Sequence, residues 1–145
     1  MPRSHIPAEV IAAYRSARYQ AGSGPDAMIL RVDQYSEPLS QLFATSGHRC
    51  AAFITACNPF GVRQSPEANR AACVRLRKRL AQYVPQLARI IEGVGLDSAG
   101  DWPGEESFLI LGLDLETSRA LGRDFHQNAI VWVDKDAIPR LILLR

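Results

Sequence analysis

The segment from Ser65 to Tyr83 constrains the fold more than any other part of the chain. Ser65 is a suitable helix cap, and Pro66 suits the first helical turn, where no amide donor is needed. At about 100° per residue, a helix over residues 66–83 has one apolar face and one basic face. The apolar face consists of Ala72, Cys73, Leu76, Leu80, Tyr83 and Leu87. Such a helix has to pack its apolar face against other elements of the fold.

Short apolar runs on both sides of this helix predict the strands of a sheet. Ala51–Ala56 ends at Asn58-Pro59, as expected of a buried strand that is stopped by proline. Further strands are predicted at residues 19–21, 27–32, 88–94, 107–113, 128–133 and 139–144, and further helices at residues 7–17, 38–44 and 115–125. This alternation predicts a single α/β (α+β) domain over residues 1–145. We expect a mixed β-sheet of about five to six strands with about three to four helices packed on it.

The cysteines and the apolar runs indicate a cytoplasmic protein. Cys50, Cys57 and Cys73 form no Cys-x-x-Cys pair and lie in or beside apolar stretches, which fits buried free thiols better than disulfides or a zinc site. A thiol such as Cys57, at the end of an apolar strand, is expected to be inert. No signal peptide is recognisable, and no apolar run approaches the roughly 20 residues that span a bilayer. We therefore expect no membrane contact.

Charge is divided into two opposed blocks, although the whole chain carries only +2. Residues 63–89 hold seven basic side chains and one acid, a net of +6, and residues 92–128 hold eight acids and two arginines, a net of −6. The basic face of helix 66–83 consists of Arg70, Arg75, Arg77, Lys78 and Arg79. It offers contacts to nucleic acid or to an acidic protein. Because no aromatic residue interleaves with these side chains, a solvated face, or one paired with the acidic block, is favoured.

Polar side chains at strand ends and helix starts predict a small-ligand pocket. The residues proposed to form it are Asn58, Asn69, Glu106 and Gln127. In α/β sheets, ligands bind beyond the carboxyl ends of strands, where Asn58 lies, and its amide can donate and accept. The alternative is that Asn58 only stabilises the turn before Pro59.

The pair Glu105-Glu106 at the start of a strand offers one carboxylate to this pocket. Successive strand residues point to opposite faces, so only one of the two faces inward, and we take it to be Glu106. Ser107 is a further candidate ligand contact. The alternative for Glu106 is a salt bridge to the basic helix. Asp97, Asp101 and Glu105 lack the spacing of a calcium loop, so neither metal nor cofactor is expected.

Several segments together resemble one bacterial protein family. They are Ala13-Tyr14 with Tyr19, Phe53-Ile54-Thr55-Ala56-Cys57-Asn58-Pro59, Glu67-Ala68-Asn69, Trp102 with Glu105-Glu106-Ser107-Phe108, and Phe125-His126-Gln127-Asn128-Ala129-Ile130. Over nearly its whole length, the sequence is similar to domain of unknown function 3293. The resemblance implies a one-domain bacterial protein and no particular activity. With no nucleophile elbow and no P-loop, the residues do not decide between a binding protein and an enzyme.

Overall fold

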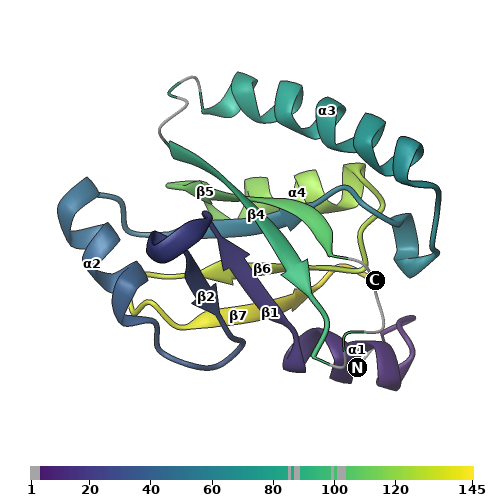
Figure 1. Cartoon of the computed structure of the whole chain (residues 1–145), viewed down its shortest axis with the longest axis horizontal. Coiled ribbons are helices and arrows are strands. Elements are labelled where there is room, and N and C mark those ends of the chain that lie inside the picture. The colour runs from purple at the N-terminus through teal and green to yellow at the C-terminus, as the bar shows by residue number, and fades with distance from the viewer. Residues whose placement is uncertain (1–3, 85, 87–88, 99, 101–103) are drawn as a thin grey trace.

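The computed structural model describes residues 4–84, 86, 89–98, 100 and 104–145. Leu87, Asp101, Trp102 and the first residue of the strand predicted at 88–94 lie outside the described residues. Within the described part of the chain, seven strands form one sheet (Figure 1). They are Arg18–Ala21 (β1), Met28–Leu30 (β2), Ala51–Thr55 (β3), Ile90–Leu96 (β4), Glu105–Leu111 (β5), Ala129–Val133 (β6) and Pro139–Leu143 (β7).

Four α-helices, counted over the same described residues, accompany the sheet. They are Ala8–Ser16 (α1), Glu37–Ser46 (α2), Pro66–Tyr83 (α3) and Leu115–Asp124 (α4). Ser65 caps α3 as predicted, because its hydroxyl oxygen accepts a hydrogen bond from the Ala68 amide at 3.1 Å. Gly47 ends α2 in the left-handed conformation, with φ of 79°. None of the helices in the described ranges has the length and hydropathy to cross a membrane.

The order across the sheet is β2-β1-β4-β5-β3-β6-β7, and every adjacent pair is antiparallel. The predicted α+β class is confirmed. The sheet has more strands than expected because the β1–β2 hairpin joins it through β4. The expected mixture of parallel and antiparallel strands is not found in the described sheet, because neither helical connection joins neighbouring strands. Here α3 leads from β3 to β4 with β5 between them, and α4 leads from β5 to β6 with β3 between them.

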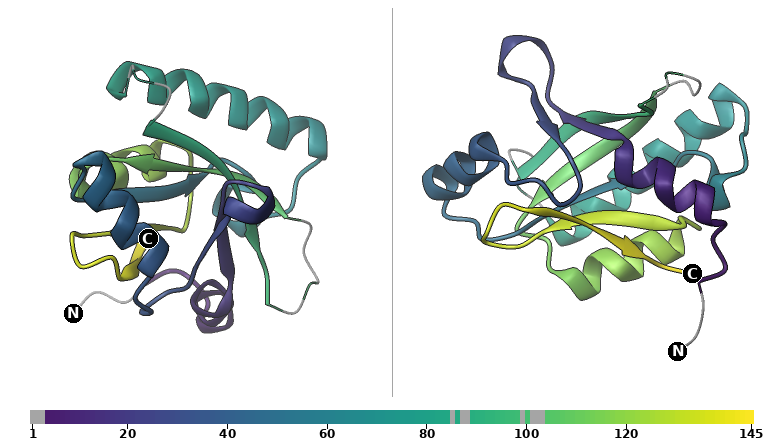
Figure 2. Two further views of the ribbon diagram at one scale, coloured as in Figure 1. Left: turned by 60° about the vertical axis from the view of Figure 1, so that its left-hand side comes forward. Right: turned by 90° about the horizontal axis from the view of Figure 1, so that it is seen from below.

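These two split connections give the βαββαβ arrangement of ferredoxin-like folds, extended by the hairpin on one edge and β7 on the other. Successive side chains of β5 point to opposite faces, so this strand contributes core residues on both faces of the sheet. Phe108 and Ile110 pack with α3 and α4, whereas Leu109 and Leu111 pack with α2 and the hairpin. Figure 2 shows α3 and α1 on opposite sides of the sheet. A core therefore lies on each side of the sheet.

The apolar face of α3 is as predicted except at its end. Tyr83 is 46 % exposed, although the helical spacing places it on the buried face. Val84, four residues after Leu80, enters the core in its place. The chain leaves the helix at this point, so the apolar stripe continues through Val84 rather than through the last helical residue.

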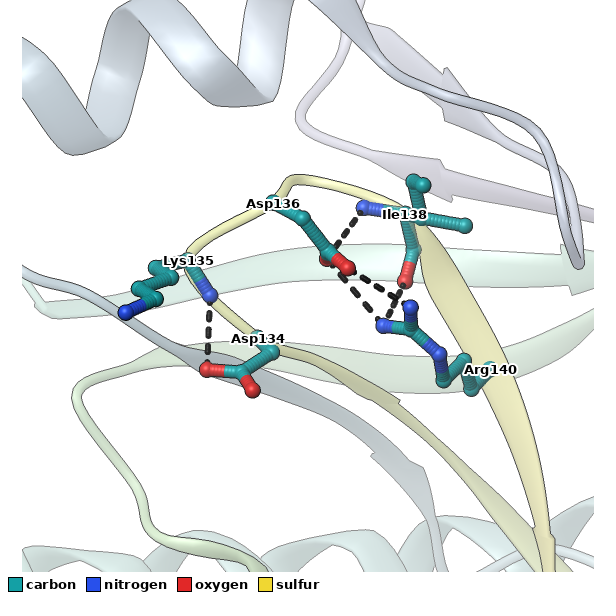
Figure 3. Close-up of polar contacts among 5 residues, drawn as sticks. All are labelled: Asp134, Lys135, Asp136, Ile138 and Arg140. Atoms are coloured by element: carbon teal, nitrogen blue, oxygen red, sulfur yellow. Dashed lines mark hydrogen bonds and ion pairs between the residues drawn. The ribbon is translucent and has the colours of Figure 1, made fainter.

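Side chains of the turn between β6 and β7 hold its shape (Figure 3). Asp136 accepts a hydrogen bond from the Ile138 amide at 3.1 Å and forms an ion pair with Arg140 at 2.6 Å. The Arg140 guanidinium lowers the pKa of Asp136. Asp134 accepts a hydrogen bond from the Lys135 amide at 2.8 Å. These local contacts fix the register in which β7 returns along β6.

Candidate functional site

One end of the sheet collects the residues that the sequence singles out. Because the strands alternate in direction, the carboxyl ends of β3 and β4 lie there beside the amino ends of β1, β5 and β6. Helix α1 covers this end from one side, and the amino end of α3 approaches it from the other (Figures 1 and 2). The candidate site is therefore built from ends of elements and not from one continuous motif.

The turn that follows β3 has an unusual backbone. Asn58, Phe60 and Gly61 have positive φ angles of 48°, 55° and 75°. A methyl group at Gly61 would lie 3.1 Å from Nδ2 of Asn128, so the glycine allows the turn to approach that side chain. Backbone in the left-handed region costs free energy for residues other than glycine and is kept where surrounding contacts fix it.

Asn58 supplies many of those contacts and is only 6 % exposed. Its Oδ1 accepts hydrogen bonds from the Gln64 amide at 3.0 Å and from Nδ2 of Asn69 at 3.1 Å. Its backbone amide donates to Oδ1 of Asn69 at 2.9 Å. Its own Nδ2 donates to Oε2 of Glu105 at 2.7 Å. Asn58 thus stabilises the turn, as one of the two interpretations predicts, and it also holds a carboxylate.

The inward-facing carboxylate is Glu105, so the expectation that it is Glu106 was wrong. Ser107 and Leu109 lie on the same side of β5 as Glu105 and are buried, whereas Glu106 is exposed on the α3 side. Alternation alone does not choose between the two glutamates, because both faces of the sheet are covered. Burial raises the pKa of Glu105, and the hydrogen bond from Asn58 partly offsets this rise.

A cavity of about 310 Å³ lies between α1 and the ends of β1 and β4, and Glu105 lies in its wall. A smaller cavity of about 70 Å³ shares part of this wall and reaches Asn58, Ser107 and Gln127. We refer to the two together as the Glu105 cavity. Both parts are lined by Tyr14, Tyr19, Gly61, Gly95 and Glu105.

Two tyrosines connect α1 and β1 to this cavity. The Tyr19 hydroxyl donates to the carbonyl oxygen of Tyr14 at 2.5 Å. The Tyr14 hydroxyl accepts from Nδ2 of Asn128 at 3.0 Å, and Asn128 Oδ1 accepts from the Arg145 guanidinium at 2.8 Å. Burial raises the pKa of both tyrosines, so both remain neutral hydrogen-bonding groups at physiological pH.

The predicted pocket residues divide between the two sides of the sheet. Asn58, Ser107 and Gln127 line the Glu105 cavity. Asn69 and Glu106 instead line a groove of about 260 Å³ on the α3 side, which Asn58 also reaches. Gln127 is held in place because its Nε2 donates to the backbone carbonyl of Cys57 at 3.1 Å.

Tyr14, Tyr19 and Glu105 were not predicted to line the site, and Asn128 was not predicted to support it through its hydrogen bond to Tyr14. All four lie in the segments that resemble the family, so the resemblance was the sequence signal that could have identified them. Among the described residues, no three His, Cys, Asp or Glu side chains are grouped so that they could hold a metal ion.

The basic face of α3 partly meets the acidic block. Arg77 forms an ion pair with Glu92, and Arg79 forms one with Asp124. The Arg77 guanidinium also lies 5.3 Å from the centre of the Phe108 ring. The other predicted members of the face are exposed: Arg70, Arg75 and Lys78. The two charge blocks therefore meet at Arg77 and Arg79.

Residues 54–130 match a family described as protein of unknown function (DUF3293). The chain belongs to this family. The DUF3293 match runs from the end of β3 to the start of β6 and so includes α3, β4, β5 and α4. It includes Asn58 and Glu105, whereas α1 and its Tyr14 lie outside it. Comparisons with curated proteins and with solved structures found no match. The family identity therefore leaves the function to be argued from the site.

Proposed function

We propose that this protein binds a small organic ligand in the Glu105 cavity, and that the ligand carries an ammonium or similar cationic group on an apolar body. One observation carries the proposal: the largely buried Glu105 carboxylate lies in the cavity wall, and no basic side chain of the described residues lines the larger cavity. A buried carboxylate without a counter-charge is unfavourable. A cationic ligand would supply that counter-charge.

The other walls of the cavity fit the same class of ligand. Val10, Ala13, Ala17 and Leu96 offer apolar surface for the body of the ligand. The rings of Tyr14 and Tyr19 lie in the wall with Glu105, and aromatic rings attract organic cations. Asn58 holds Oε2 of Glu105, so the geometry of the carboxylate is fixed before a ligand arrives. In an enzymatic version of this proposal, Glu105 accepts a proton from the bound ligand, which suits a carboxylate of raised pKa.

The experiment compares alkylammonium and arylalkylammonium ions with neutral alcohols of the same shape, using isothermal titration calorimetry. We expect the ammonium ions to bind and Glu105→Gln to weaken them at least about tenfold, a loss of roughly 1.4 kcal/mol. Glu106→Gln is the matched control, because the adjacent carboxylate lies on the other side of the sheet, and it should bind like the wild type. Equal binding of ammonium ions and alcohols, or equal losses in both variants, would contradict the proposal.

A second candidate function is the binding of an acidic protein or nucleic acid by the basic face of α3. It is favoured by one observation: Arg75 and Lys78 line an open groove of about 470 Å³ and form no ion pair within the described residues. Such binding must weaken steeply as salt is raised. A fluorescence titration with labelled RNA at two salt concentrations tests it, and binding that is insensitive to salt excludes it. The three free thiols are the basis for proposing a cytoplasmic location for either function.

A further inference from the structure

We propose that Cys57 and Cys73 form a redox-active dithiol, which closes to a disulfide by exchange with small disulfide molecules. Their Sγ atoms lie 3.7 Å apart. Cys57 follows β3 and Cys73 lies within α3, so the contact is made by the fold and not by sequence spacing. Cys57 is 4 % exposed and Cys73 is 2 % exposed. This inference is independent of the ligand proposed for the Glu105 cavity.

The geometry requires only a small movement. A disulfide bond is about 2.05 Å long, so the sulfurs must approach each other by roughly 1.7 Å, which rotation of the two side chains can provide. Both sulfurs already face one peptide group, since the Glu106 carbonyl oxygen lies 3.6 Å from Sγ of Cys57 and 3.7 Å from Sγ of Cys73. This shared contact holds the two thiols on the same side of β5.

The two thiols have different acidities, and this difference decides which of them attacks a disulfide. The hydrogen bond that the two sulfurs share lowers the pKa of Cys57. The same hydrogen bond raises the pKa of Cys73, because the proton is shared with its neighbour. Cys57 is therefore the attacking thiolate and Cys73 the resolving thiol.

A small oxidant can reach the pair through the groove on the α3 side, which both cysteines line. The exposed Arg70 guanidinium also lines this groove. Its positive charge attracts an anionic disulfide, and oxidised glutathione is a probe of that class. Cys57 was expected to be inert because it was taken as a single thiol at the end of an apolar strand. The sequence does not indicate that Cys73 lies beside it.

The exchange takes place in two balanced steps. The Cys57 thiolate attacks one sulfur of oxidised glutathione, whose disulfide bond breaks and releases one glutathione thiolate. Cys73 then gives up its proton and attacks Sγ of Cys57 in the mixed disulfide, which releases the second glutathione. The protein loses two electrons and two protons, and one oxidised glutathione becomes two reduced ones.

The new bond would join β3 to α3 beside the hydrogen bonds between Asn58 and Asn69. Cys57 directly precedes Asn58, and Cys73 lies one helical turn after Asn69. A bridge between positions 57 and 73 closes a short loop of the unfolded chain. A disulfide that closes a loop of about this length stabilises the folded protein, and the expected rise in Tm is roughly 6–12 °C.

The experiment incubates the full chain with ratios of oxidised to reduced glutathione, traps free thiols by alkylation and maps the products by mass spectrometry. We expect a peptide that links Cys57 to Cys73, one remaining free thiol at Cys50, and a Tm that rises on oxidation and returns with reductant. Cys50→Ser is the matched control and should form the bridge like the wild type, because Cys50 contacts the Leu113 carbonyl oxygen and neither of the other thiols. Cys57→Ser and Cys73→Ser should each abolish it.

Three freely alkylated thiols in folded wild-type protein after exposure to excess oxidised glutathione would overturn the inference. So would a glutathione adduct at Cys57 that persists without closing onto Cys73. Both results come from the wild-type chain, so they do not depend on how well the serine variants fold.

Discussion

Glu105 and Glu106 are adjacent in β5, and they lie in opposite environments. Glu105 lies in a cavity with apolar and tyrosine walls, and Asn58 holds one of its oxygens. Glu106 is exposed in an open groove that it shares with thiols, amides and arginines. Strand alternation separates the two side chains, but the elements that cover each face determine which one is buried. The chemistry of this end of the sheet thus depends on α1, which is distant in sequence from both glutamates.

Asn58 connects the two sides. Its Nδ2 reaches Glu105 on the cavity side, while its Oδ1 and backbone amide bind Asn69 at the start of α3. The two sides therefore share one structural element, the turn after β3. Changes at Asn58 should disturb both sides, and changes at either glutamate should disturb one.

The largest effect is expected for Asn58→Ala. This substitution removes three side-chain hydrogen bonds and leaves the Gln64 amide without its acceptor, at a backbone φ of 48° that alanine tolerates poorly. We expect the free energy of unfolding to fall by about 2–4 kcal/mol, measured by urea denaturation. Asn58→Gly separates the two causes, because it restores the backbone freedom but not the hydrogen bonds, and should lose less. A loss below about 0.5 kcal/mol in Asn58→Ala would mean that the turn is held by other contacts.

The next largest effect is on the pH dependence of stability, which should differ between variants of Glu105 and Glu106. Glu105 has a raised pKa in the folded protein, so the folded state binds more protons than the unfolded state at pH values between the two pKa values. Stability therefore falls as pH rises from about 4.5 through the folded pKa, and is constant above it. Glu105→Gln keeps an acceptor for Asn58 and removes this loss, so it should stabilise the protein at pH 7 and flatten the profile.

Glu106→Gln provides the control for that profile. Because the Glu106 side chain is exposed, its replacement should retain the dependence on pH that Glu105 causes. Thermal unfolding of both variants between pH 4 and pH 8 tests the difference. Two identical profiles would show that burial does not distinguish the glutamates.

The smallest effect is expected on the α3 side, at the ion pair between Arg77 and Glu92. The Arg77 side chain is half-buried and Glu92 is exposed, so the pair is reached by water, weak and screened by salt. We expect Arg77→Ala to cost about 0.2–1 kcal/mol, part of it from the lost contact with the Phe108 ring. Arg75→Ala removes an exposed arginine without an ion pair in the described residues and should cost less. Chemical denaturation at low and high salt measures both variants, and a loss at Arg77 that salt does not reduce would contradict the account.

Local patterns in the sequence were enough to predict most elements of the fold. The Ser65 cap, the apolar stripe of α3 up to Leu80 and the apolar run of β3 are local features, and each forms as predicted. The pairing of strands is not local. β3 lies between β5 and β6, so both helical connections skip a strand, and no periodicity indicates this.

The site was predicted only in part, because it also depends on contacts between residues that are distant in the sequence. Asn58 was identifiable because a polar residue between a buried strand and a proline is a local signal. Glu105 was not distinguishable from Glu106, because the difference comes from α1 folding over one face. The contact between Tyr14 and Asn128 joins residues 114 positions apart, and the contact between Cys57 and Cys73 joins two different elements. Such contacts follow only from the completed sheet.

The titration of the Glu105 carboxyl carbon by NMR, in free protein and with a saturating alkylammonium ion, tests the proposed site most directly. In free protein, we expect a midpoint above the ordinary range of glutamate, because the carboxylate is buried. With the ammonium ion bound, the midpoint should fall, because a nearby positive charge favours the ionised form. A midpoint in the ordinary range in free protein, or one that the ammonium ion does not move, would contradict a cation-binding site at Glu105.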